Sequence, residues 1–139
     1  MILLYANPSE VKYVNYKSKY CIGLMAENMG KHNNDMFLKN LIFNGNKEVI
    51  LFDCSGWRGS RKSAEFDKLY HWDRTLLVDM ESEIVEKLCK NLGVKFTSIR
   101  YIIDLDRGKV MPTGINHFWR KFQHRRMQLK FNKYLENLK

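Results

Sequence analysis

Three aspartates stand directly after short apolar runs, at positions where buried strands would end. Asp53 follows Ile-Leu-Phe, Asp79 follows Leu-Leu-Val, and Asp104 follows Tyr-Ile-Ile. Parallel neighbouring strands share one carboxyl edge of a sheet, so three such carboxylates would converge there. Clustered carboxylates hold Mg²⁺ or Mn²⁺, and these ions activate water for phosphodiester cleavage. The pattern allows a metal-dependent nuclease or phosphodiesterase, but Asp also suits turns and helix caps, and we favour that simpler interpretation.

A second candidate site is the glycine- and serine-rich stretch from Asp53 to Ser60, which we expect to be a loop followed by a short helix. A loop beyond the carboxyl end of a strand and before a helix N-terminus suits a phosphate group. The candidate phosphate-binding residues are Arg58, Gly59, Ser60, Arg61 and Lys62. Their spacing matches neither a P-loop nor a dinucleotide fingerprint, and Arg61 stands one residue too far from Cys54 for a cysteine phosphatase. We favour a plain connecting loop and keep phosphate binding as the alternative.

The best-defined signal lies near the C-terminus, where a long amphipathic helix is expected. From Gly114 onward the chain has seven basic residues and one acid, a net charge of +6 in 26 residues, against +9 for the whole chain. We expect the apolar residues of this helix to bury against the sheet and to leave the bases in water. They are Ile115, Phe118, Phe122, Met127, Leu129, Phe131, Tyr134 and Leu138. A basic helix face binds phosphates in a salt-dependent manner. The expected nucleic-acid contacts are Arg120, Lys121, Arg125, Arg126 and Lys130.

Other side chains give weaker signals. His71 precedes Asp73 by two residues, and His117 and His124 stand seven residues apart, but none forms a recognisable catalytic or metal-binding pattern. We expect these histidines to be structural or to lie on the surface. Tyrosines and lysines alternate between residues 12 and 20, a mixture that suits stacked bases and phosphates but is also ordinary in strands.

The elements that would position these residues alternate between strands and helices. Strands are expected over residues 1–5, 11–20, 48–52, 75–78 and 94–105. Helices are expected over residues 35–43, 63–70, 82–92 and 114–139. This order predicts an α/β fold, with a small single-layer sheet, helices packed on it and a long basic C-terminal helix. The alternative is α+β, because residues 106–109 can turn a hairpin.

Composition limits the class of protein. The chain has 139 residues, 45% of them hydrophobic, which suits one globular domain over residues 1–139. No apolar run approaches the roughly 20 residues of a membrane span, and no secretory signal is recognisable. Three widely spaced cysteines favour neither a disulfide framework nor a zinc site, so we expect a reducing intracellular compartment. Abundant Lys and Asn are compatible with an AT-rich, viral coding source.

The sequence therefore predicts a small basic protein that binds nucleic acid through its C-terminal helix. The first alternative is the nuclease that would use Asp53, Asp79 and Asp104 with Mg²⁺ or Mn²⁺. The second is a binder of a nucleotide or other phosphorylated small ligand at the 53–62 loop. The third is an inhibitor or adaptor whose basic face docks on an acidic protein surface.

Overall fold

The computed structural model describes residues 1–22, 40, 47–59, 61–73, 75, 77–78, 81–105 and 113–138. Its centre is a six-stranded mixed sheet with the order β2-β1-β3-β6-β4, and β5 pairs with β3 off this path. The strands are β1 (Ile2–Tyr5), β2 (Lys19–Cys21), β3 (Glu48–Trp57), β4 (Tyr70–His71), β5 (Leu77–Val78) and β6 (Lys95–Leu105). The pairs β1·β2, β1·β3 and β3·β6 are parallel, whereas β4 and β5 pair antiparallel to their neighbours.

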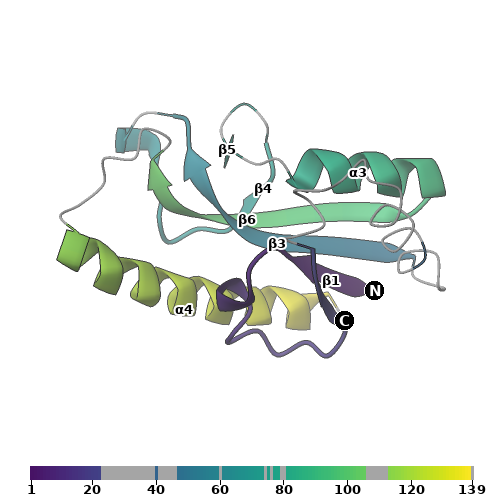
Figure 1. Cartoon of the computed structure of the whole chain (residues 1–139), viewed down its shortest axis with the longest axis horizontal. Coiled ribbons are helices and arrows are strands. Elements are labelled where there is room, and N and C mark those ends of the chain that lie inside the picture. The colour runs from purple at the N-terminus through teal and green to yellow at the C-terminus, as the bar shows by residue number, and fades with distance from the viewer. Residues whose placement is uncertain are drawn as a thin grey trace.

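Two long helices cover opposite faces of this sheet, α3 (Glu81–Leu92) and α4 (Thr113–Asn137) (Figure 1). Because successive strand residues point to opposite faces, Ile50 and Phe52 pack toward α4 while Val49 and Leu51 pack toward α3. The core on the α4 side includes Met127, Phe131 and Leu135, and the core on the α3 side includes Val85, Leu88 and Cys89. The three layers confirm the α/β prediction.

From β1 the chain continues to a strand on one side of the sheet, and from β3 it continues to a strand on the other side. After β1, a 3₁₀ turn (η1, Pro8–Glu10) leads to β2 on the side of the sheet that α4 covers, where Val11 and Val14 join the core. After β3, the chain passes through α3 on the opposite side before it reaches β6. The carboxyl ends of β1 and β3 therefore form a topological switch point, the place where ligands most often bind in open α/β sheets.

Four expected elements match closely: the first strand, the strand at 94–105, and the helices at 82–92 and 114–139. The strand at 75–78 is present as the two residues of β5. Neither α3 nor α4, the long helices within the described residues, has an apolar stretch that could cross a membrane.

Three expectations need correction. The prediction of a loop over residues 53–60 was wrong for its first half. There β3 continues to Trp57 alongside β6, with a bulge between Ser55 and Gly56. The helix at 63–70 is replaced by a short 3₁₀ turn (η2, Arg61–Ser63) and an irregular stretch. Of the strand expected at 11–20, only the last two residues are in a strand, where they belong to β2. The expected helix at 35–43 and hairpin at 106–109 fall outside the described residues, apart from position 40, which is helical.

Candidate functional site

The apolar residues of α4 lie on two opposite sides of the helix. Met127 and Phe131 are fully buried against the sheet, whereas Phe118 is 75% exposed, Phe122 58% and Leu129 47%. The expectation that these last three would bury against the sheet was therefore wrong. At 100° per residue, positions 118, 122 and 129 fall within one sector that lies opposite positions 127 and 131. The outward side of α4 is thus both aromatic and accessible.

Basic residues share this outward side. Lys121 and Arg125 are exposed and stand one helical turn apart, directly beside Phe118 and Phe122. Lys130 and Lys133 continue the basic character toward the C-terminus, where Glu136 is the one acid in the sequence of α4. We call Phe118, Lys121, Phe122 and Arg125 the outer face of α4. Arg120 is also exposed, but the helical period places it toward the sheet side, near His124.

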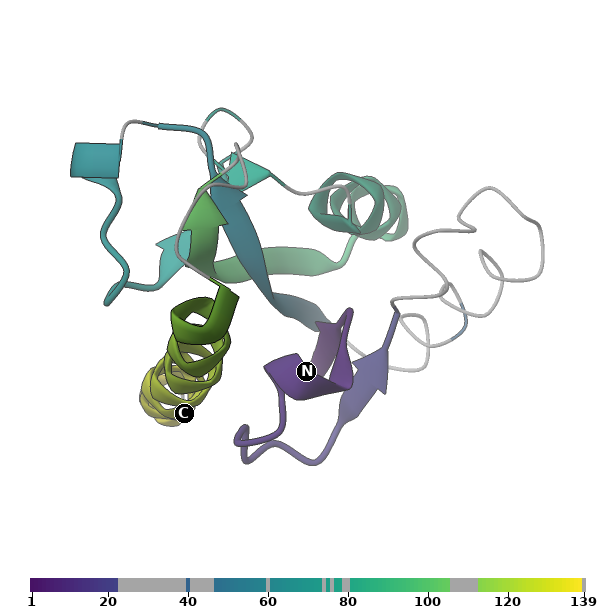
Figure 2. The ribbon, with the colours of Figure 1, turned by 60° about the vertical axis from the view of Figure 1, so that its left-hand side comes forward.

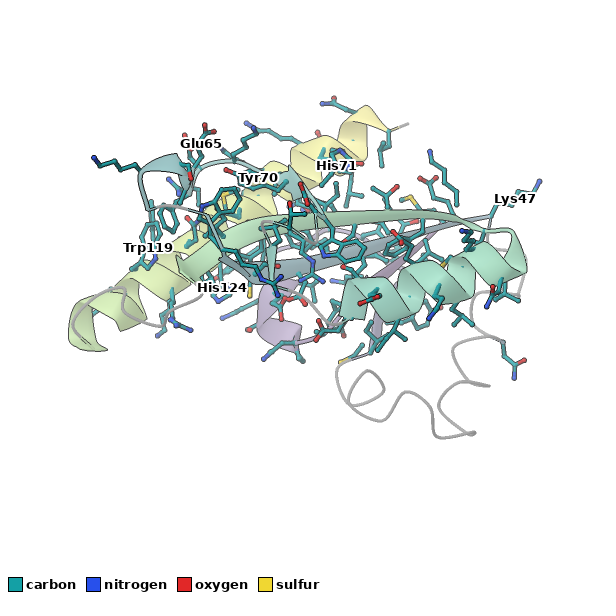
Figure 3. The ribbon with its side chains drawn as sticks, turned by 90° about the horizontal axis from the view of Figure 1, so that it is seen from above. Lys47, Glu65, Tyr70, His71, Trp119 and His124 are labelled. Atoms are coloured by element: carbon teal, nitrogen blue, oxygen red, sulfur yellow. The ribbon has the colours of Figure 1, made fainter. Side chains whose placement is uncertain are left out.

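Arg126 has a different role from the one the sequence suggested. Its Nη2 donates hydrogen bonds of 2.7 Å to the Phe66 carbonyl and 2.5 Å to Gln123 Oε1. Its guanidinium also lies 5.9 Å from the ring centroid of Trp119 and 5.3 Å from that of Phe122. The half-buried Arg126 therefore links α4 to the backbone of the residues after η2 by a hydrogen bond, and it packs against the Phe122 ring. Figure 3 shows Trp119 at the same end of the molecule as Glu65, opposite Lys47.

The other flank of α4 holds the connection between β1 and β2 (Figure 2). Gln128 Oε1 accepts a 2.7 Å hydrogen bond from the Tyr13 amide, and its Nε2 donates to the Ser9 carbonyl at 2.8 Å. Asn132 accepts from the Asn15 amide and donates to the Tyr13 carbonyl. These side chains bond to the backbone of a connection that lies outside the strands, and they attach this connection to α4.

Tyr13 extends the outer face beyond the helix. Its ring is 37% exposed, with Lys12 Nζ 5.6 Å and the Arg125 guanidinium 5.7 Å from the ring centroid. The alternation of tyrosines and lysines in the sequence thus gives one aromatic ring beside two cations on the α4 surface, at an irregular connection rather than in a strand.

The stretch after β3 shows a structural role for its glycine. A Cβ on Gly59 would stand 2.6 Å from Trp57 Nε1 and 3.1 Å from Ser63 Oγ, two atoms that are themselves hydrogen-bonded at 3.4 Å. Gly59 is therefore needed for the close approach of the backbone to the indole. The turn that follows has only three residues, so the helix N-terminus expected beside Arg58 and Lys62 is not there. Ser60 and the Arg61 side chain lie outside the description.

The strand register separates Asp53 from Asp104, two of the three aspartates that were expected to converge. Strands β3 and β6 are parallel neighbours, as expected, but Asp53 lies opposite Arg100 whereas Asp104 lies opposite Gly56. This offset of three residues along β3 separates the two backbone positions by about 10 Å along the sheet. Asp79 and the Asp104 side chain lie outside the description.

Asp53 instead belongs to a buried polar network around Arg100. Asp53 Oδ2 lies 3.3 Å from Arg100 Nη1, and the two side chains are 7% and 1% exposed. The guanidinium also donates to Ser55 Oγ at 3.0 Å, to the Cys54 carbonyl at 3.2 Å and to Ser82 Oγ at 3.0 Å. A buried arginine needs a counterion and hydrogen-bond acceptors, and this network supplies Asp53 as the counterion and an acceptor for each guanidinium nitrogen.

Glu10 was not singled out by sequence, although it is buried at the switch point. Its Oε2 accepts a 3.0 Å hydrogen bond from the Cys54 amide, at a position of β3 beyond the end of β1 at Tyr5. Donor atoms of Glu10, Asp53 and Cys54 all lie within 4.8 Å of one another. Both carboxylates already accept hydrogen bonds from the protein, so the arrangement fits a structural network better than an open metal site.

A tyrosine and a histidine pair beside this network. Tyr101 Oη lies 2.5 Å from His124 Nδ1. Burial raises the pKa of Tyr101, and the nearby Cys54 and Asp53 raise it further. Burial lowers the pKa of His124, and the positive charge of Arg120 lowers it further. Both shifts favour the neutral forms of the phenol and the imidazole, and the tautomer of His124 decides which of the two donates.

No family model, curated protein or solved structure matches this chain. Its chemistry therefore has to be argued from its own residues. The buried network of Glu10, Asp53 and Arg100 at the switch point consists of hydrogen bonds and an ion pair within the protein. The outer face of α4 is exposed, positively charged and held on a rigid helix.

Proposed function

We propose that this protein binds nucleic acid through the outer face of α4. The supporting observation is that Lys121 and Arg125 are exposed one turn apart on a helix whose other sides are occupied by the core and by two anchored connections. Lys and Arg on such a face neutralise backbone phosphates and release condensed counterions. Binding of this kind has little sequence preference, because phosphates carry no sequence information.

The distribution of charge supports the same partner. The last 26 residues hold +6 of the +9 net charge, so the surface potential is concentrated around α4. A concentrated positive surface attracts polyanions and speeds their association. Arg126 donates to the Phe66 carbonyl and Lys130 Nζ to the Asp67 carbonyl, so both belong to the fold as well. Lys121, Arg125 and Lys133 are therefore the better candidates for phosphate contacts.

The test is a binding titration against salt. Fluorescence anisotropy would follow labelled single- and double-stranded DNA and RNA of about 20 nucleotides, longer than the roughly 4–16 that one small domain covers. We expect affinity to fall steeply between about 50 and 200 mM salt. The double variant Lys121→Gln/Arg125→Gln should bind more weakly, and its log–log salt slope should be shallower by about 1.4, or 0.7 per lost contact on single strands.

The matched control removes two exposed lysines from α3. Lys87→Gln/Lys90→Gln loses the same formal charge on the other side of the sheet and should leave the salt slope unchanged. Equal weakening by both double variants would show that only net charge matters, and no binding at low salt would refute the proposal.

The same samples also test the alternative functions. Shortened strands that appear only with Mg²⁺ or Mn²⁺, and not in Asp53→Asn, would favour the nuclease. Thermal stabilisation by free nucleotides would favour a phosphorylated small ligand, and capture of an acidic protein with no nucleic-acid binding would favour the adaptor.

A further inference from the structure

Two exposed phenylalanines on the outer face require an explanation that phosphate binding does not give. Phe118 and Phe122 are 75% and 58% exposed on a helix whose Met127, Phe131 and Leu135 already complete the core. Scattered apolar residues are common on protein surfaces. These two rings, however, are neighbours on one helical row and alternate with Lys121 and Arg125.

The Phe122 ring is held in place before any ligand arrives. Trp119 lies 6.5 Å away between ring centroids, and the Arg126 guanidinium lies 5.3 Å from the Phe122 ring. Arg126 is itself fixed by the Phe66 carbonyl and Gln123. A ring positioned in this way loses little conformational entropy when a flat partner stacks on it.

We propose that the outer face of α4 selects single-stranded nucleic acid by stacking bases on Phe118 and Phe122 while Lys121 and Arg125 contact the phosphates. This inference rests on the proposed function and adds the class of strand. Aromatic side chains interleaved with bases are the combination that proteins use for single strands, because every base has a ring face.

The spacing of the rings disfavours a duplex. Residues four apart on a helix rise by about 6 Å, whereas the stacked bases of a duplex are only about 3.4 Å apart along its axis. In a duplex the base faces are covered by their neighbours, so Phe118 and Phe122 would find only base edges and backbone. A single strand can unstack and present one base to each ring.

The test compares three probes of equal length: an oligothymidylate strand, an abasic strand with the same phosphates, and a duplex. We expect the wild-type chain to bind the thymidylate strand at least about tenfold more tightly than either other probe. Phe118→Leu/Phe122→Leu should lose this preference and keep its salt slope, because the phosphate contacts remain. Leu129→Ala, which shortens an exposed apolar residue of the same side, is the matched control and should keep the preference.

The outcomes separate the two proposals. If the charge variant binds weakly while the phenylalanine variant still prefers thymidylate over the abasic strand, stacking is refuted and phosphate binding stands. Equal binding of thymidylate and abasic strands, or tighter binding of the duplex, would also refute stacking. If the free wild-type chain self-associates in light scattering and the phenylalanine variant does not, the rings belong to an interface between copies. Absence of binding to every probe would overturn both proposals.

Discussion

At the scale of residues, Arg100 and Asp53 form a buried charge pair that could not be predicted from the sequence. Arginine is almost never fully buried unless it is paired, so a sequence gives no reason to place Arg100 in the core. Its hydrogen-bonding partners come from β3, from α3 and from β6 itself, and none is recognisable as a partner before the strand register is known. Asp53 is conspicuous in sequence, but its carboxylate neutralises Arg100 inside the protein.

His124 gives a prediction for the dependence of stability on pH. Because the folded chain holds the pKa of His124 below its ordinary value of 6.5, the unfolded chain binds more protons in the window between the two values. The contribution of His124 to the free energy of unfolding should be complete above pH 6.5 and be lost as pH falls through the lowered pKa. Urea unfolding at a series of pH values would measure it.

The comparison that isolates this effect uses two glutamine variants. His124→Gln should lose less stability than the wild type on acidification, whatever its stability at neutral pH. His71→Gln, at an exposed histidine, should follow the wild type. Parallel curves for the wild type and His124→Gln would show that folding does not lower the pKa of His124.

At the scale of elements, long periodic segments were predictable and their ends were less so. The strand at 94–105 and both long helices follow from β-branched runs and helical spacing. The continuation of β3 through Ser55 and Gly56 did not, because those residues are typical of loops and are held in a strand by pairing with β6 and, at Gly56, also with β5. The outward side of α4 was misassigned for a related reason: apolar residues on both sides of a helix give no single buried stripe.

The connection between β1 and β2 should depend on α4 for its order. Gln128→Ala and Asn132→Ala each remove two side-chain hydrogen bonds to this backbone, and we expect each to lower the free energy of unfolding by about 1–3 kcal/mol. Faster hydrogen exchange at the Tyr13 amide in Gln128→Ala, and at the Asn15 amide in Asn132→Ala, would locate the effect. Asn137→Ala, at the exposed end of α4, is the control, and unchanged exchange at both amides would contradict the anchoring role.

At the scale of the whole molecule, the basic C-terminal segment is part of the core as well as a surface. The sequence correctly predicted a helix over this segment, but the count of its charges describes only its surface. The structure shows one helix that closes the core on one face and anchors two connections on its flanks. The anchoring of two connections could not be predicted from the sequence, because Gln123, Gln128 and Asn132 are residue types that are also common on solvated surfaces.

A chain that ends at residue 112 should therefore fail to fold cooperatively. Burial of Met127, Phe131 and Leu135 contributes roughly 1.5–3 kcal/mol each, and their sum is comparable to the roughly 5–15 kcal/mol that stabilises a whole domain. Without α4, Leu3, Ile50 and Phe52 would lose the apolar partners that cover them. Circular dichroism should show no sharp thermal transition for the shortened chain, and a cooperative transition like that of the full chain would mean that α4 is a dispensable tail. Because folding and the outer face share one helix, loss of nucleic-acid binding should be assigned to the outer face only in variants such as Lys121→Gln/Arg125→Gln, whose cooperative unfolding is preserved.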